Sequence, residues 1–316
     1  NGAAVTWTRC IPLRSPTMSR LVAFSLEAGD GRVGRLALLA PLAAAGVAGL
    51  VAWRWATSRT PPPSGKILVS EPDLSDLEER YLLEAYRSTF ISGGAGNFKK
   101  RLETEFSAMC GCSHGVAVCN GTVAISLALL AGGLQRGGEV IVPSFTYVAS
   151  AAAVVSVGGV PVFVDCDPEL GLMDAEMVRR AVSTKTKFIM AVHIYGHVPD
   201  MDTINAIAKE SNLLVLEDAA EAHGATYKGR PAGSLGDMAT FSFYANKVMT
   251  TGEGGIIVTN NAALASRMVY LRGHAMSPEI RFWHTDIGFN YRLSNLLCAI
   301  GVAQLERFAH LFGNRL

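Results

Sequence analysis

The sequence predicts an α/β fold in which a mainly parallel sheet of about seven strands carries helices on both faces. Short, almost purely apolar segments recur along the chain, as expected of strands that are buried on both sides. Stretches with helical periodicity separate most of these segments, which is the pattern of alternating strands and helices. Several apolar segments end in acidic or other polar residues, and open α/β sheets bind their ligands at the carboxyl ends of their strands.

Each predicted strand is rich in Val, Ile, Leu or Phe and is bounded by Gly, Pro or polar residues. The strands in chain order are 116–118, 139–143, 160–164, 187–192, 213–216, 239–243 and 256–259. Helices are predicted where apolar residues recur at helical spacing or where a capping residue precedes them. They span 74–86, 98–109, 124–130, 203–210 and 296–308. Asp73 or Ser75 is expected to cap the first of these helices, and residues 199–202 the fourth.

The composition is that of a globular protein without a strong charge bias. The chain has 316 residues, of which 49% are hydrophobic and 17% charged, and this is enough for one large α/β domain with extra segments. The formal charge of +1 gives no electrostatic reason to expect a nucleic-acid partner. The six cysteines lack zinc-site spacing, so the sequence predicts no metal site and free thiols in a reducing compartment.

Residues 1–66 are expected to form a leader that is separate from the folded domain at 67–316. Within this leader, residues 36–53 form a run without charges, close to the minimum length of roughly 18 residues for a membrane-spanning helix. Its high alanine content and Pro41 weaken that signal. A membrane anchor or an uncleaved signal, a cleaved targeting peptide and a non-native leader all fit this pattern. Residues 58–65 are rich in proline and predict an extended linker.

A lysine and an acid follow two of the predicted strands. Lys247 lies in a polar turn after the strand 239–243, ahead of the glycine-rich turn 252–255. The strand 213–216 leads directly into Glu217 and Asp218. Because the carboxyl ends of parallel strands share one edge of the sheet, these side chains are expected near one another and suggest cofactor chemistry.

A third polar element, 120–123, follows the strand 116–118 and precedes a predicted helix. It consists of Asn120, Gly121, Thr122 and Val123. Backbone N–H groups at a helix start carry positive partial charge and can bind a phosphate, and a glycine lets the anion approach closely. This turn is therefore a candidate phosphate site.

The segments 217–224 and 242–247 resemble the pyridoxal phosphate (PLP) dependent nucleotide-sugar aminotransferases of the DegT/DnrJ/EryC1/StrS family. Further motifs between about Ile67 and Phe308 occur in the order found in that family. The resemblance implies the large domain of the type I aminotransferase fold. Members of the family continue into a small C-terminal domain, so a chain that stops at Leu316 is expected to be truncated before that domain.

The resemblance also implies roles for individual residues. Lys247 would bind PLP covalently and move protons, and Asp218 would pair with the protonated ring nitrogen. Glu221 would approach the ring oxygen or the substrate; alternatively, it is a solvated acid at a helix start. Tyr147 would stack on the cofactor ring. The implied phosphate-binding residues are Gly121, Thr122, Val123, Ser242 and, from the neighbouring subunit of a homodimer, Asn290.

The implied reaction transfers an amino group from glutamate, which leaves as 2-oxoglutarate, to a 4-keto-6-deoxy sugar nucleotide in a cytoplasmic type of enzyme. Similarity to perosamine-type members favours a GDP-linked sugar. His193, His284 and Ser92, which lies in the glycine-rich loop 90–97, are candidate substrate contacts. Some members replace the lysine by histidine and become dehydratases, and Lys247 argues against that branch.

Three other interpretations stay open from the sequence. The first is a non-catalytic remnant that keeps the cofactor pocket. The second is a membrane-tethered binding or scaffold protein. The third is another type of PLP enzyme, such as a racemase or a cysteine desulfurase, although the sequence offers no mobile reactive cysteine for the latter.

Overall fold

The computed structural model describes residues 70–94 and 96–315 of the chain. All of them belong to one compact unit, Leu68–Leu316. The predicted leader at 1–66, with its apolar run at 36–53, lies outside the described residues. Within the two described ranges, no helix combines the length and the hydropathy that crossing a bilayer requires.

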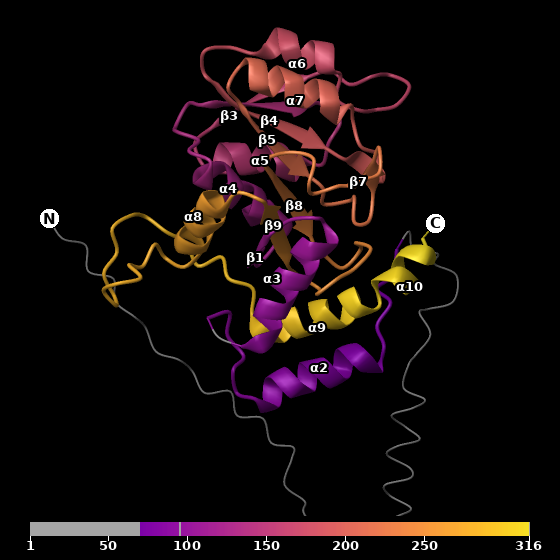
Figure 1. Ribbon diagram of the computed structural model, residues 1–316, viewed down its shortest axis with the longest axis vertical. Helices are drawn as coiled ribbons and strands as arrows, with labels where there is room; N and C mark the ends of the chain where they lie inside the picture. Colours follow the sequence, from indigo (N-terminus) through magenta and orange to yellow (C-terminus); the bar gives the residue numbers. More distant parts are fainter. Residues whose placement is uncertain (1–69, 95, 316) are drawn as a thin grey trace, which may run out of the picture. The chain divides into compact units, whose positions relative to one another are not determined.

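A seven-stranded sheet forms the centre of this unit (Figure 1). Strand β9 runs antiparallel to both of its neighbours, and all other neighbouring strands are parallel. The prediction of a mainly parallel sheet of about seven strands is therefore confirmed. The strand order across the sheet is β1 (His114–Val118), β9 (Gly255–Thr259), β8 (Met238–Ser242), β5 (Leu214–Asp218), β4 (Thr186–Val192), β2 (Glu139–Pro143) and β3 (Val160–Val164). A separate hairpin pairs β6 (Thr226–Tyr227) with β7 (Arg230–Pro231).

Alternation along the buried strands supplies an apolar core on each face of the sheet. In β4, Phe188 and Met190 belong to the core beneath one group of helices, and Ile189 and Ala191 to the core on the opposite face. The first group consists of α4 (Gly121–Ala131), α5 (Val148–Ser156) and α8 (Ala262–Arg272). The opposite face is covered by α6 (Ala175–Ala181) and α7 (Met201–Glu210), and further along the sheet by α2 (Asp76–Arg87), α3 (Asn97–Met109), α9 (Asn295–Glu306) and α10 (Phe308–Gly313).

The expected caps and one unexpected break define the ends of these helices. Ser75 caps α2 in a capping box, because its hydroxyl accepts a hydrogen bond from the Leu77 amide while its own amide donates to Glu78. The helix predicted at 296–308 corresponds to α9, which ends two residues earlier at Glu306, and Arg307 separates it from a short further helix, α10. The guanidinium of Arg307 is bound by the carboxylates of Asp73 and Glu78, which fixes the junction against the start of α2.

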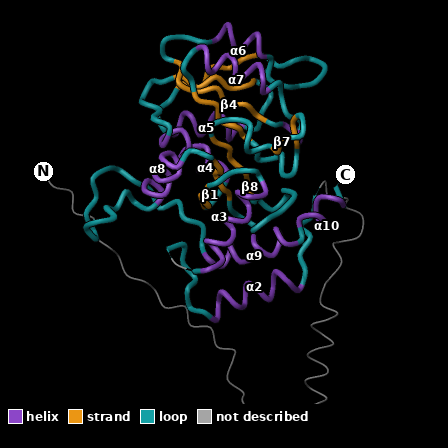
Figure 2. Tube along the Cα trace, viewed as in Figure 1, coloured by secondary structure: helices purple, strands orange, loops and turns teal. Residues whose placement is uncertain are grey.

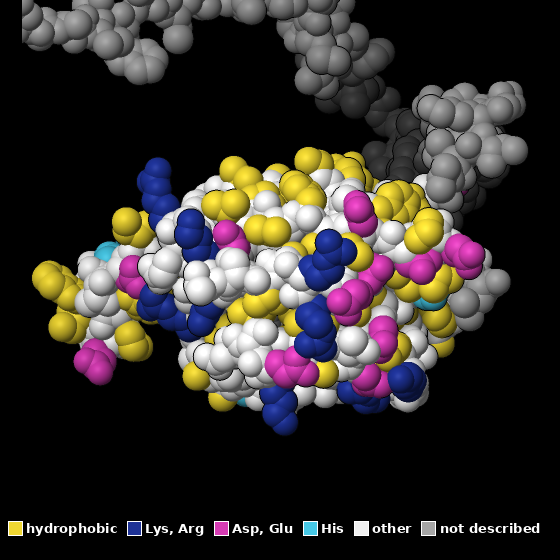
Figure 3. All heavy atoms as spheres, turned by 90° about the horizontal axis from the view of Figure 1, so that it is seen from above, with side chains coloured by type: hydrophobic (Ala, Val, Ile, Leu, Met, Phe, Trp, Pro, Cys, Tyr) yellow, Lys and Arg dark blue, Asp and Glu magenta, His cyan; other side chains and the backbone are white. Residues whose placement is uncertain are grey.

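A long loop connects α8 to α9, and Figure 2 shows it in teal. This loop projects from the rest of the unit and carries exposed apolar side chains, which are seen at the left of Figure 3. Ile280, Phe282, Trp283 and Ile287 are its most exposed large apolar residues, and Ile287 is 82% exposed. Monomeric proteins seldom expose large apolar patches without a binding function.

Candidate active site

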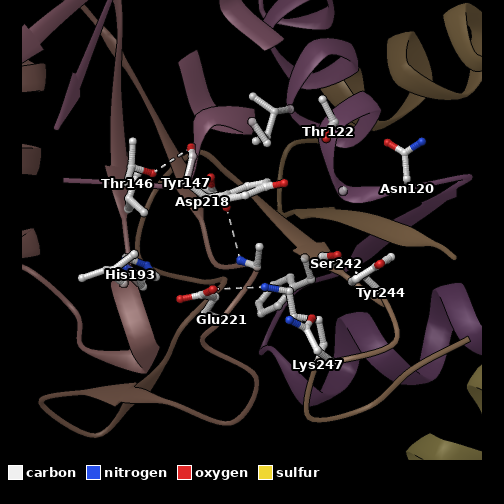
Figure 4. Close-up of a pocket in the computed structure, with 18 of the residues that line it drawn as sticks. Asn120, Thr122, Thr146, Tyr147, His193, Asp218, Glu221, Ser242, Tyr244 and Lys247 are labelled. Carbon is white, nitrogen blue, oxygen red and sulfur yellow. Dashed lines mark hydrogen bonds and ion pairs between the residues drawn. The ribbon is translucent and has the colours of Figure 1, made fainter. Parts of the chain in front are cut away.

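A cavity of about 500 Å³ opens at the carboxyl ends of β4, β5 and β8, beside the N-terminus of α4 (Figure 4). Its walls come from parts of the chain that are far apart in sequence, as expected at the strand ends of an α/β sheet. The site residues predicted from the sequence that line it are Gly121, Thr122, Val123, Tyr147, His193, Asp218, Glu221, Ser242 and Lys247.

Lys247 projects into the cavity from the turn that follows β8. The backbone amide of Lys247 donates to the Tyr244 carbonyl at 2.9 Å, and this bond closes the turn. Its Nζ lies 3.2 Å from Oε1 of Glu221, and the lysine side chain is only 16% exposed. The other carboxylate oxygen of Glu221 accepts a hydrogen bond from the Tyr195 amide at 3.0 Å. Glu221 therefore joins the lysine to the opposite wall of the cavity.

Asp218, the last residue of β5, places a buried carboxylate in the same cavity. Its Oδ2 accepts a hydrogen bond from the Ser150 hydroxyl at 2.6 Å, and its Oδ1 accepts one from the Ala220 amide at 3.3 Å. Burial raises the pKa of the Asp218 carboxyl above its ordinary value, and these two hydrogen bonds oppose the rise. A cation at this position would stabilise the ionised form, so the carboxylate suits a protonated nitrogen.

The N-terminus of α4 forms the end of the cavity that suits an anion. Asn120 caps this helix, and its side-chain oxygen accepts a hydrogen bond from the Val123 amide at 2.9 Å. The first turn directs further backbone N–H groups outward, where they can bind an oxyanion. Ser242, at the end of β8, lies so close that a Cβ atom at position 121 would be 2.9 Å from its Cβ. Gly121 is therefore required for this close approach.

Tyr147 supplies an aromatic surface. It is the N-cap residue of α5, and its side chain is 72% exposed. Its ring extends into the cavity near Asp218 (Figure 4). An exposed phenol ring beside a carboxylate offers a flat apolar face to a planar ligand.

His193 lines the cavity as well, but it is fully buried. Its Nε2 lies 2.8 Å from the carboxylate of Glu217, which is also fully buried. Glu217 accepts three further hydrogen bonds, from the backbone amides of Gly233, Leu235 and Gly236. His193 is thus held by a carboxylate whose two oxygens both accept other hydrogen bonds as well. Contact of His193 with a substrate stays a prediction.

Three predicted site residues lie outside this cavity. Ser92, His284 and Asn290 are all exposed. His284 bonds through Nδ1 with the His274 carbonyl at 2.8 Å, and Asn290 pairs in an isolated bridge with Gly273. Their contacts with a substrate or with a cofactor in a second subunit stay predictions.

Sequence reasoning missed Ser150, and it placed Glu217 at a strand end without its role in holding His193. Ser150 is fully buried and binds Asp218 directly. A faint signal existed, because Ser150 follows Tyr147 by one helical turn in an otherwise apolar segment. The role of Glu217 depends on a turn that lies 16 residues or more away along the chain, and the sequence gives no sign of that contact.

The family profile of the DegT/DnrJ/EryC1/StrS aminotransferases matches residues 72–316. The chain belongs to this family. It is 51% identical to a GDP-perosamine synthase of Caulobacter vibrioides over 242 residues, which cover 77% of this chain and 65% of the relative. It is 45% identical to a GDP-perosamine synthase of Escherichia coli O157:H7, with 76% of this chain and 66% of the relative covered. The chain thus spans just under two thirds of the length of these relatives.

Solved structures show the same fold. An aminotransferase from Psychrobacter cryohalolentis superposes with a TM-score of 0.72 and 36% identity, and the match covers 76% of this chain and 64% of that protein. DesI, solved in the presence of its TDP-sugar product, superposes with a TM-score of 0.73 and 33% identity over 79% of this chain and 63% of DesI. The type I aminotransferase fold expected from the sequence is therefore confirmed.

The cavity fits the PLP cofactor that this family implies. PLP is a flat ring with a phosphate, an aldehyde and a ring nitrogen, so it needs an anion site, an amine, a carboxylate and an apolar face. The N-terminus of α4, Lys247, Asp218 and Tyr147 offer these four features around one cavity. An ionised carboxylate as buried as that of Asp218 is costly without a partner, and a protonated ring nitrogen would supply one.

Proposed function

We propose that this chain is the cofactor-binding domain of an aminotransferase that moves an amino group from glutamate to a 4-keto-6-deoxy sugar nucleotide. The observation that carries the proposal is the convergence of Lys247, Asp218 and the N-terminus of α4 on one cavity. Relatives named GDP-perosamine synthase, at 45% and 51% identity, favour a GDP-linked sugar as the acceptor.

Each group of residues in the cavity would have a separate role toward PLP. PLP would supply an electron sink that lets a proton leave the carbon bearing the amino group. Asp218 would hold the ring nitrogen in its protonated form, and the first turn of α4, together with Ser242, would bind the phosphate. Tyr147 would cover one side of the ring and exclude water from it.

Lys247 and Glu221 would handle protons. An amine must lose its charge before it can attack an aldehyde or accept a proton. At 3.2 Å from Nζ, the Glu221 carboxylate is placed to hold the ammonium and to accept its proton. Nζ of Lys247 could then take up and return the proton that moves between donor and acceptor.

The acceptor is tested with a panel of ketosugar nucleotides. The full-length protein that contains this domain, with PLP and glutamate, is expected to aminate a GDP-linked 4-keto-6-deoxy sugar with a higher kcat/KM than dTDP- or UDP-linked analogues. Formation of 2-oxoglutarate and of the amino sugar is followed together. The Lys247→Ala variant serves as control and should lose turnover with every acceptor.

The outcomes separate the two halves of the proposal. Preference for a dTDP- or UDP-linked sugar would reject the GDP assignment and leave the aminotransferase intact. Bound PLP without amino transfer to any acceptor would favour a non-catalytic member of the family.

We also propose that two copies of the chain form a homodimer whose active sites are shared, with Asn290 of one subunit reaching the phosphate site of the other. The exposed position of Asn290 and the apolar loop that precedes it support this arrangement.

A further inference from the structure

We propose that Ser150 is a positioning residue for Asp218, and that a directional hydrogen-bond chain from Thr146 through Ser150 keeps the Asp218 carboxylate ionised and oriented toward the cofactor ring. This inference rests on the proposed use of PLP. It adds a residue outside the cavity lining, on a helix whose sequence is almost entirely apolar.

The chain of contacts is short and buried. Ser150 has no exposed surface, and its hydroxyl lies 2.6 Å from Oδ2 of Asp218. On its other side, the same hydroxyl lies 2.8 Å from the hydroxyl of Thr146, which lines the cavity. Thr146, Tyr147 and Ser150 all belong to the entry and first turn of α5, so one element would position both the ring contact and the carboxylate.

The direction of these hydrogen bonds follows from proton counting. A hydroxyl has one proton to donate, and an ionised carboxylate can only accept. The Ser150 hydroxyl therefore donates its proton to the Asp218 carboxylate, and the Thr146 hydroxyl donates to the Ser150 oxygen. Both bonds thus run toward Asp218, and they favour its ionised form over a protonated carboxyl.

The other groups that face Asp218 act in the same sense but from different elements. The Ala220 amide donates to Oδ1 at 3.3 Å. The charge of Lys247 and, when its ring is protonated, that of His193 also favour the ionised carboxylate, and burial opposes all of these groups. Of the two hydrogen bonds to the Asp218 carboxylate, the one from Ser150 is the shorter, and it fixes Oδ2 in place.

A second buried hydroxyl pair, between α4 and α5, offers a matched control. Ser126 on α4 is almost fully buried, and its hydroxyl lies 3.1 Å from that of Ser156 on α5. Within residues 70–94 and 96–315, the hydrogen-bond partners of this second hydroxyl pair include no carboxylate. Ser126→Ala therefore removes a buried hydroxyl that contacts α5 without touching Asp218.

The test uses protein loaded with PLP that is labelled with ¹⁵N at the ring nitrogen. A carboxylate that has lost its donor binds a proton more tightly, so in Ser150→Ala the N–H bond of the ring weakens and an O–H bond forms at Asp218. The ¹⁵N signal should move from the protonated toward the unprotonated position, and Thr146→Val should give a smaller shift of the same sign. We expect kcat to fall about tenfold in Ser150→Ala, with little change in the KM for glutamate, the effect of losing one hydrogen bond to a charged group.

Ser126→Ala should leave the ¹⁵N signal and kcat at the wild-type values, and Ser150→Thr, which keeps the hydroxyl, should restore both. If Ser150→Ala matches Ser126→Ala in signal and rate, the role of Ser150 is overturned while the proposed function stands. If Ser150→Ala does not fold, Thr146→Val carries the test, and an unchanged ¹⁵N signal in that variant overturns the proposal. Failure of the wild-type protein to bind PLP would overturn the proposed function and this inference together.

Discussion

Lys247 differs from surface lysines of the same unit in what surrounds its amine. The side chain of Lys228 is 65% exposed and pairs with Asp202 on the surface, whereas that of Lys247 is 16% exposed and pairs with Glu221 inside a cavity. Exposed ion pairs contribute little to stability because water screens them. The Lys247–Glu221 pair lies inside the cavity, so it can hold the amine in place for a ligand there. A surface pair such as Lys228–Asp202 cannot do this.

Reduction with borohydride tests this difference chemically. When the PLP-loaded protein is reduced and digested, the cofactor should be found on the peptide that contains Lys247, because only an amine within the cavity can bond to the aldehyde. Lys228 is the internal control for nonspecific labelling at high PLP concentration. Stoichiometric label on Lys228 or on any other lysine would reject the assignment of Lys247.

At the scale of residues, the sequence predicted the site residues that lie at strand ends. It did not predict residues whose role depends on contacts between distant parts of the chain. Asp218 and Lys247 could be predicted because apolar strands that end in a polar turn are visible in the sequence itself. The contact of Ser150 could not, since its partner Asp218 is 68 residues away and the spacing of Ser150 from Tyr147 does not show which residue the serine binds.

At the scale of elements, the seven strands of the main sheet were located within about two residues of their observed ends, because each is a short apolar run bounded by Gly, Pro or polar residues. The short hairpin of β6 and β7 was not predicted. Helices α5, α6, α8 and α10 were not delimited. The sequence of α5 is almost entirely apolar, so it shows no contrast between a buried and an exposed face. The break after α9 was also missed, because it depends on Arg307 binding to α2 across the fold.

The start of α4 is the element on which phosphate binding is expected to depend. In Gly121→Ala, the new Cβ would lie 2.9 Å from the Cβ of Ser242, so the helix start must move away from β8. We expect the Kd for PLP to rise about tenfold or more, as for the loss of a hydrogen bond to a charged group, while the fold is retained. The Kd is measured by titrating PLP and following its absorbance.

Gly313→Ala is the control for this variant, because a Cβ at position 313 meets no atom within 4 Å. It should bind PLP as tightly as the unmodified protein. Equal affinity in Gly121→Ala and Gly313→Ala would mean that the α4 N-terminus does not hold the phosphate.

At the scale of the whole molecule, the loop between α8 and α9 exposes apolar side chains that no other part of the described residues covers. Phe282 is 73% exposed and Trp283 is 59% exposed on this projecting segment (Figure 3). Aromatic side chains of this kind are enriched where proteins bind one another. Asn290 follows them in the chain, so a second copy that packs on this loop would bring Asn290 to the partner molecule.

A shared active site predicts complementation between two inactive variants. Asn290→Ala should weaken PLP retention by roughly 1–3 kcal/mol, the effect of removing a hydrogen bond to a charged group. Lys247→Ala should be inactive on its own. When the two variants are dissociated and reassembled together, a mixed dimer contains one site with both Lys247 and Asn290 intact, and part of the amino transfer should return. Each variant reassembled with itself is the control. A mixed dimer that is verified by mass yet recovers no activity would show that Asn290 acts within its own subunit or only shapes the loop.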